Sequence, residues 1–116
     1  MTMRPFTATM AGISPVHVPA TPATLVVQTV SVQVDVTSGH HTSAKIEYTS
    51  AGEAVVVYLP LSFAYSEPAT GYDVFHAAAH MTLYADPDTD IVLTQYSPVG
   101  TSGTTFLTVS GYLEEF

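Results

Sequence analysis

Three aspartates at alternate positions, Asp86, Asp88 and Asp90, are the strongest candidates for metal chemistry in this chain. Ca²⁺ is a hard ion that takes oxygen ligands, and alternate carboxylates in one turn can converge on it. The pattern lacks the glycine and the distal glutamate of an EF-hand loop, and aspartate is also a common turn former. We therefore expect either a Ca²⁺ site or a solvated turn at this place, and no other cofactor.

Four of the five histidines fall in two pairs, which raises the question of a zinc site. In an extended strand, His76 and His80 would lie about 13 Å apart. Each ligating nitrogen must come within ~2 Å of the metal, so these two cannot share one ion. His40 and His41 are adjacent, and in an extended chain they point in opposite directions. We interpret the histidines as residues of a wet face or an interface.

Nucleophilic catalysis and phosphate binding find little support in the sequence. The chain has no cysteine, and Ser110 stands in Val-Ser-Gly without the rest of a Gly-x-Ser-x-Gly elbow. Phosphate-binding glycine loops are absent too. The sequence therefore predicts that the chain is not an enzyme, and an enzyme with an unrecognised site is the third hypothesis.

Tyrosine rings are amphipathic and can stack on sugars, although tryptophan, the commoner sugar platform, is absent. A carbohydrate-binding β-sandwich module is therefore the main alternative function. The tyrosines concerned are Tyr48, Tyr58, Tyr65, Tyr72, Tyr84, Tyr96 and Tyr112.

The elements that position these residues are strands, because apolar residues alternate along most of the chain. Residues 54–65 and 73–85 form the two longest alternating runs, and we expect them to pair with a bend or bulge near Pro60. Shorter runs follow the same rule, with an irregularity near Gln28 and a loop over residues 97–103.

This pattern predicts an all-β fold, a single-domain antiparallel β-sandwich that is jelly-roll-like or a small barrel, with an extended N-terminal arm. We expect no helix, since no stretch shows a capped 3.6-residue period. The expected core consists of Val34, Ile46, Val57, Leu59, Phe63, Phe75, Met81, Leu83, Leu93, Leu107 and Val109.

Residues 1–23 differ from the rest because four prolines exclude a helix there. The segment is also too apolar for a solvated tail, so it either packs along its own domain as an irregular edge or lies on a neighbour. We expect the second, an assembly arm attached to a β-sandwich domain of residues 24–116. Its apolar contact residues would be Phe6, Met10, Ile13, Val16 and Val18.

Charge is the most unusual feature of the composition. Charged residues make up 10% of the chain, against about 25% in ordinary soluble domains. Arg4 and Lys45 face ten acidic residues, for a net charge of −8. This balance argues against nucleic acid and membrane partners, which need clustered cations. The low charge is typical of surfaces covered by other subunits, although a soluble domain kept apart by its negative charge also fits.

Together these features predict a non-enzymatic structural protein that forms a homo-oligomer, such as a trimer, and docks on a larger shell or tail assembly. The most specific hypothesis is a small virion protein of a tailed phage: a capsid decoration or cementing subunit, or a tail or connector component. Residues 1–6 carry one positive charge and no apolar run follows them. We therefore expect synthesis in the cytoplasm without a signal peptide and a final location in the virion.

Overall fold

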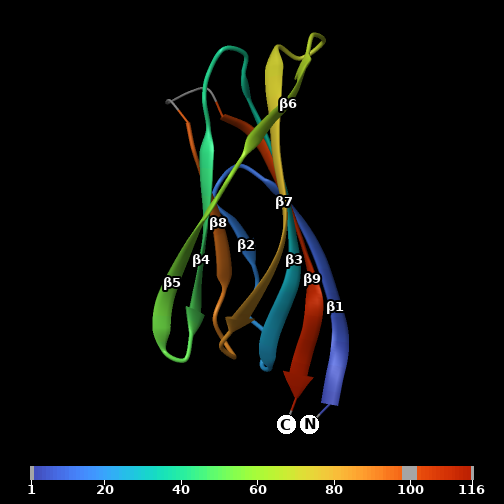
Figure 1. Ribbon diagram of the computed structural model, residues 1–116, viewed down its shortest axis with the longest axis vertical. Coiled ribbons are helices and arrows are strands. Elements are labelled where there is room, and N and C mark those ends of the chain that lie inside the picture. Colours follow the sequence, from blue (N-terminus) through green and yellow to red (C-terminus); the bar gives the residue numbers. More distant parts are fainter. Residues whose placement is uncertain (1, 98–101, 116) are drawn as a thin grey trace.

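The computed structural model describes residues 2–97 and 102–115, which fold into two antiparallel sheets packed together (Figure 1). The five-stranded sheet has the order β1-β9-β3-β7-β6, and the four-stranded sheet has the order β2-β8-β4-β5. The strands are β1 (Thr2–Gly12), β2 (Val16–Val18), β3 (Thr24–Thr37), β4 (Ser43–Ser50), β5 (Glu53–Leu59), β6 (Ser62–Glu67), β7 (Tyr72–Ala85), β8 (Ile91–Tyr96) and β9 (Ser102–Glu115). The all-β sandwich expected from the alternation is confirmed.

In the described part of the chain, no helix is long and apolar enough to cross a membrane. Residues 98–101, which belong to the loop expected over residues 97–103, lie outside the described residues.

Side chains from both sheets fill the space between them and form one core. Seven of the expected core residues are buried, namely Val34, Ile46, Leu59, Leu83, Leu93, Leu107 and Val109. Val57, Phe75 and Met81 are half-buried and pack against this cluster. The alternation therefore identified the inward faces of most strands correctly.

Phe63 is the exception, and its expected place in the core is wrong. The run over residues 54–65 divides at Pro60, where the chain leaves the four-stranded sheet and enters the five-stranded one. Only the second half, β6, pairs with β7. Because β6 is an edge strand, Phe63 is 56% exposed, and its ring meets the edge of Phe75 at a centroid distance of 5.7 Å.

A bulge in β3 confirms the irregularity expected near Gln28. The pairing of β3 with both of its neighbours, β7 and β9, shifts between Val27 and Thr29. In the same region Gly111 of β9 lies against the backbone of Val26, where a β-carbon would overlap the Val26 carbonyl. Glycine is therefore needed at residue 111 for the two strands to pack.

The N-terminal segment is extended as expected, but it is part of the sandwich. β1 pairs with β9 along its whole length, and β2 pairs with β8. Val16 and Val18 are buried in the core. The division into an arm ending at residue 23 and a separate domain is therefore corrected: pairing with β9 satisfies one backbone edge of β1, and Pro5 is tolerated because β1 lies at the sheet edge.

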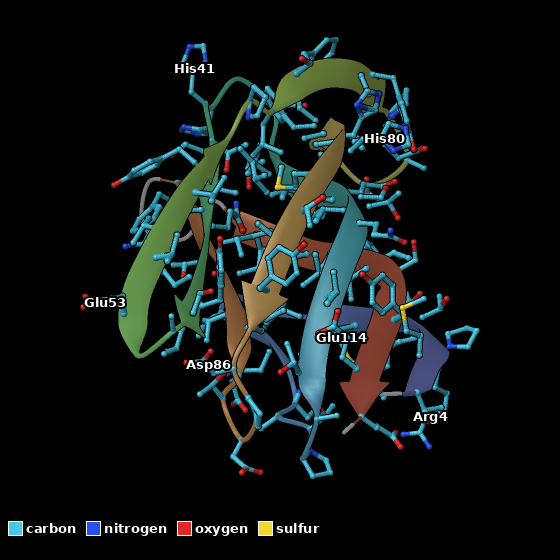
Figure 2. The ribbon with its side chains drawn as sticks, turned by 60° about the horizontal axis from the view of Figure 1, so that its bottom comes forward. Arg4, His41, Glu53, His80, Asp86 and Glu114 are labelled. Carbon is cyan, nitrogen blue, oxygen red and sulfur yellow. The ribbon has the colours of Figure 1, made fainter. Side chains whose placement is uncertain are left out.

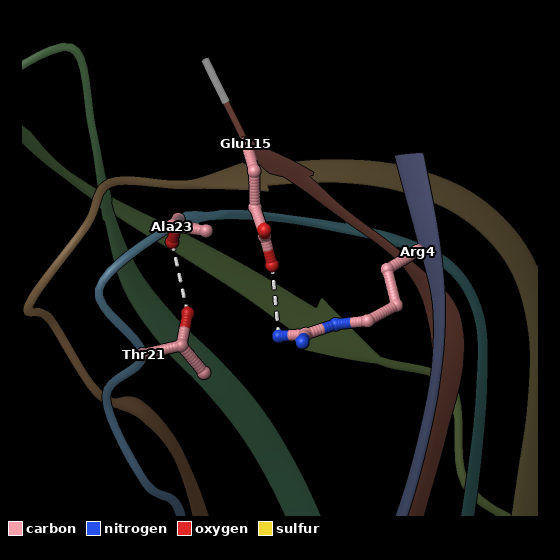
Figure 3. Close-up of polar contacts among 4 residues, drawn as sticks. All are labelled: Arg4, Thr21, Ala23 and Glu115. Atoms are coloured by element: carbon pink, nitrogen blue, oxygen red, sulfur yellow. Dashed lines mark hydrogen bonds and ion pairs between the residues drawn. The ribbon is translucent and has the colours of Figure 1, made fainter. Parts of the chain in front are cut away.

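The two ends of the chain lie together at one end of an elongated molecule, whose principal dimensions are 50 × 24 × 20 Å (Figure 1). Arg4 of β1 forms a 2.8 Å ion pair with Glu115 of β9 (Figure 3). Nearby, the hydroxyl of Thr21 donates a 2.8 Å hydrogen bond to the carbonyl of Ala23, just before β3 begins. The ion pair is exposed, so it contributes less to stability than the β1–β9 pairing does.

Candidate functional site

Two of the three aspartates considered for Ca²⁺, Asp86 and Asp90, accept hydrogen bonds from backbone N–H groups in the structure. The carboxylate of Asp86 accepts hydrogen bonds from the backbone N–H groups of Ala51 and Gly52, both at 2.8 Å. Its own backbone N–H donates to the carbonyl of Thr49 at 2.8 Å. Asp86 therefore connects the end of β7 to the turn between β4 and β5, at the lower end of the molecule (Figure 2).

Asp90 is engaged elsewhere. One of its carboxylate oxygens accepts a 2.9 Å hydrogen bond from the backbone N–H of Ala20, and the other lies 3.5 Å from Nδ1 of His17. Asp88 has a φ of +61°, so the third residue of this turn is left-handed, unlike that of a type I turn. Among the described residues, no three histidine or acidic side chains come together in a way that would hold a metal ion.

The histidines do not form a joint site. His76 and His80 are exposed on the same face of β7, where they lie opposite Gln33 and Thr29 of β3. His40 and His41 lie in the loop before β4 and line a hollow of about 530 Å³ together with Tyr96. Figure 2 shows His41 far from Asp86, and His80 lies near the middle of β7.

The five residues expected to form an assembly arm have three different environments. Phe6 and Met10 are half-buried and pack against the core from the inner face of β1. Val16 and Val18 are buried within it. Ile13, between β1 and β2, is 83% exposed, so it is the member of the set that offers an apolar side chain to another molecule.

An uncharged surface covers the outer face of the five-stranded sheet, across β1, β9, β3 and β7. We call this surface the outer sheet face. It consists of Pro5, Thr7, Thr9, Ala11, Phe106, Thr108, Ser110, Tyr112, Val26, Thr29, Ser31, Gln33, His76, Ala78, His80, Thr82 and Tyr84. None of these residues is aspartate, glutamate, lysine or arginine.

Hydrogen bonds between hydroxyl groups, and two tyrosine rings, hold side chains in place on the outer sheet face. The hydroxyls of Thr9 and Thr108 are hydrogen-bonded at 3.1 Å, and a second hydroxyl pair joins Thr29 to Ser110. Val26 points outward, yet it is only 1% exposed. Its neighbours in the β-ladder, Tyr84 and Tyr112, flank it on either side.

A shallow hollow of about 320 Å³ lies in the middle of the outer sheet face. Phe106, which is 38% exposed, lines it together with Gln33 and the hydroxyl residues Thr9, Ser31 and Thr108. An aromatic ring beside neutral hydrogen-bonding groups is an arrangement that a neutral sugar ring can use.

The four-stranded sheet presents a second surface at its β5 edge. Tyr58 is 75% exposed and Val56 is 44% exposed, both on the outer face of the strand. The ammonium of Lys45, opposite Tyr58 on β4, lies 5.4 Å from the centre of the Tyr96 ring and 3.1 Å from the Glu47 carboxylate. The Tyr96 phenol and this carboxylate raise the pKa of Lys45, so the lysine remains charged.

Two polar clusters were not identified from the sequence. Asp73 accepts hydrogen bonds from the hydroxyls of Ser66 at 2.7 Å and Ser38 at 2.9 Å, and from the backbone N–H of Gly39 at 3.1 Å. These donors, Ser66 first, lower the pKa of Asp73. Asp73 thereby ties the β3–β4 loop to β6 and β7.

The second cluster surrounds Gln95, which faces the core and is 8% exposed. Its side-chain amide donates to the hydroxyls of Thr42 at 3.1 Å and Ser97 at 3.0 Å, and accepts from the hydroxyl of Thr105 at 3.3 Å. The sequence contains one indication of this cluster: Gln95 follows Ile91 and Leu93 at alternate positions of β8, so its side chain points toward the core. A polar residue at such a position needs buried partners.

Comparison of the chain with protein-family models, with curated proteins and with solved structures finds no match.

Proposed function

We propose that this chain is a non-enzymatic structural protein that acts through protein–protein contacts. The most specific form of the proposal is a small virion protein of a tailed phage, either a capsid decoration or cementing subunit or a tail or connector component. The observation that carries it is the outer sheet face, which runs across four strands without a charged side chain in a protein of net charge −8.

The size of the outer sheet face suits a contact surface. Four strands about 4.8 Å apart and some eight residues long cover about 500 Å². A specific interface of ordinary size buries about 800 Å² on each partner, so this face would supply most of one side. Charged residues are depleted in the cores of such interfaces and tyrosine is enriched, which fits the presence of Tyr84 and Tyr112.

Two acidic residues lie at the ends of this face. Glu114 lies at one end of it, next to the ion pair of Arg4 and Glu115, and Asp35 lies at the other. Glu53 and Asp86 lie outside this face, at the β4–β5 turn and just after β7 (Figure 2). Charges at the margin keep the free chains soluble and leave the centre of the face dry on contact.

The alternative function, a carbohydrate-binding module, is favoured by one observation, the hollow beside Phe106. The hollow has about 320 Å³ available and is lined by a ring, an amide and hydroxyls. In that case the outer sheet face would bind a neutral glycan rather than a protein surface.

The proposal is tested by co-expressing the chain with the proteins encoded next to its own gene and asking whether it sediments with assembled particles. Ser31→Glu and Thr108→Glu place charges in the middle of the outer sheet face, and both should abolish co-sedimentation without changing the thermal melt. Ser43→Glu, at an exposed position of β4, is the matched control and should bind normally.

Two results would overturn the proposal. One is a chain that never sediments with particles made by its neighbouring genes. The other is binding to a neutral glycan on an array that Phe106→Ala removes, which would establish the carbohydrate-binding alternative.

A further inference from the structure

β5 is the least protected edge strand of the sandwich. It pairs with β4 on one side, and within the described residues its other side has no strand partner. From Ala54 to Leu59 it reads Ala-Val-Val-Val-Tyr-Leu, without charge, proline or glycine. Such an edge readily accepts another strand, and proteins usually protect it with lysine, proline, a bulge or a short length.

The other three edge strands carry such protection. β1 contains Arg4 and Pro5, and β2 is three residues long. The pairing of β6 with β7 shifts at a bulge between Phe63 and Tyr65. β5 therefore stands apart from the other edges, which indicates that its free edge is occupied when the protein functions.

The β4–β5 turn determines which backbone groups of β5 are free. Ala51 and Gly52, with φ values of 51° and 78°, form a two-residue turn in which both central residues are left-handed, as in type I′. The flanking residues Ser50 and Glu53 are then a hydrogen-bonded pair, and such pairs alternate along the ladder. The N–H and C=O groups of Ala54, Val56 and Tyr58 consequently point away from β4.

We propose that two copies of this chain pair through their β5 strands, antiparallel and about a two-fold axis at Val56. This inference rests on the proposed function and names a partner for it, a second copy. Val56 of each copy lies opposite Val56 of the other, and Ala54 lies opposite Tyr58. Each of these three pairs exchanges two backbone hydrogen bonds, and the two four-stranded sheets become one continuous sheet.

The sequence of β5 is self-complementary in this register. Val55 lies opposite Val57, and Glu53, the single acid of the strand, lies opposite Leu59. The two Glu53 residues are then about 20 Å apart. That distance exceeds the Debye length of about 8 Å at physiological salt, so the negative charge does not oppose pairing.

The β4–β5 turn, which precedes β5, is held in place by hydrogen bonds. Asp86 binds the N–H groups of both Ala51 and Gly52 at 2.8 Å, which fixes the hairpin to the end of β7. A strand edge that is already ordered loses less conformational entropy when a partner binds.

The pairing is weak in dilute solution because the contact is small. A seven-residue strand is about 23 Å long, and with side chains on both faces it buries some 300 Å² per copy, well below the roughly 800 Å² of an ordinary interface. Copies that dock side by side on a common shell experience an effective concentration in the millimolar range, where such a contact is populated. The β5 edge would thus join neighbouring copies.

Disulfide trapping of the full-length chain tests this geometry, since the chain has no cysteine of its own. Two residues opposite each other in a hydrogen-bonded pair have α-carbons about 5.5 Å apart, which lies within the 4.4–6.8 Å span of a disulfide. Val56→Cys should therefore form covalent dimers at least ten-fold faster than Ser43→Cys, a control at an exposed position of β4 outside the outer sheet face. Equal rates, or faster trapping of Ser43→Cys, would overturn the proposal.

A second measurement avoids cysteine chemistry. In sedimentation equilibrium from 10 µM to 1 mM, the unmodified chain should show a reversible monomer–dimer equilibrium that Val56→Lys weakens at least ten-fold. Val56→Pro removes an N–H that points away from β4, so it should have the same effect and retain the cooperative melt. A chain that stays monomeric at 1 mM, or dimerisation that is unchanged by both variants, contradicts the inference.

The two proposals fail in distinguishable ways. If the Val56 variants dimerise normally while particle co-sedimentation depends on Ser31 and Thr108, the β5 inference is wrong and the proposed function stands. If the Val56 variants lose dimerisation but no particle binding is found, the pairing is real and the virion role is wrong.

Discussion

Gly111 packs so closely against Val26 that a β-carbon at residue 111 would overlap the Val26 carbonyl. Val26 belongs to β3, the central strand of the five-stranded sheet, and cannot move without disturbing both of its neighbours. Gly111→Ala should therefore lower the free energy of unfolding by about 1–3 kcal/mol, the usual cost of overpacking. Urea denaturation followed by circular dichroism measures this change.

Gly12→Ala is the control for that prediction. A β-carbon at Gly12 would meet no atom within 4 Å. Its substitution should change the free energy of unfolding by no more than about 0.5 kcal/mol. Similar losses for the two alanine variants would show that β9 does not approach β3 at Gly111 in the way described.

The second prediction concerns the N-terminal strands. Deleting residues 1–19 removes β1 and β2, including Val16 and Val18, each of which contributes about 1.5–3 kcal/mol through burial. The truncated chain should lose its cooperative thermal melt. Ile13→Ser, at an 83% exposed position, should melt like the full-length protein.

This expectation is the opposite of the one derived from the sequence, in which residues 1–23 lie outside the domain. A truncated chain that still melts cooperatively near the temperature of the full-length protein would support an N-terminal arm outside the domain. It would also show that β9 does not need β1 as a neighbour.

Alternation predicted most strands because it is a local property, but it could not reveal where the chain changes sheets. Val57 and Leu59 face the core from one sheet, and after Pro60 the chain continues in the other with nearly the same period. Two sheets that share one core impose the same alternation on both strands. The exposure of Phe63 follows from its edge position, which depends on the pairing of β6 with β7.

The candidate surfaces could be predicted only in part, for a similar reason. The low charge of the chain was evident from its composition, but the outer sheet face brings together strands as distant as β1 and β9. The role of Asp86 depends on hydrogen bonds to residues 34 and 35 positions away. The sequence around the alternate aspartates does not reveal those distant partners. The three aspartates were therefore considered as ligands of a metal ion.

The third prediction concerns acid stability. Hydrogen bonds from Ser66, Gly39 and Ser38 lower the pKa of Asp73 below its usual 3.8. A carboxylate whose pKa is lower in the folded state stabilises the fold above its unfolded pKa, and this contribution is lost as the pH falls through the folded pKa. Asp73→Asn should therefore lower the melting temperature at pH 7. The difference from wild type should shrink below about pH 4, and a constant difference would contradict the hydrogen-bond explanation.

The fourth prediction concerns Asp35, whose pKa is shifted in the opposite direction from that of Asp73. Burial raises the pKa of Asp35, and a hydrogen bond from Gln33 offsets part of this effect. One oxygen of Asp35 is buried without a hydrogen-bond partner among the described residues. A group whose folded pKa is raised destabilises the fold while it is ionised, and this cost disappears as the pH falls through the folded pKa.

Asp35→Asn should consequently raise the melting temperature at pH 7, and the gain should vanish in acid. Scanning calorimetry of wild type, Asp35→Asn and Asp73→Asn over the same pH series distinguishes the expected rise in melting temperature for Asp35→Asn from the expected fall for Asp73→Asn. A destabilising Asp35→Asn at neutral pH would mean that the carboxylate has a partner in solution.

The last prediction concerns the two phenylalanines at the β6 edge. Phe75 is half-buried against the core, whereas Phe63 is 56% exposed and meets the Phe75 ring edge-on at 76°. Full burial of both rings would make each alanine variant cost about 3–5 kcal/mol. From the structure we expect Phe75→Ala to cost about 2–3 kcal/mol and Phe63→Ala about 1 kcal/mol, in proportion to the buried part of each ring.

A double-mutant cycle isolates the contact between the rings. Because edge-to-face pairs contribute about 0.5–1.5 kcal/mol beyond their buried area, the double variant should lose less stability than the two single losses combined, by that amount. Urea unfolding of the four proteins provides the free energies. Strictly additive losses would mean that the rings do not touch in solution, and a Phe63→Ala loss as large as that of Phe75→Ala would place Phe63 back in the core and β6 inside the sandwich.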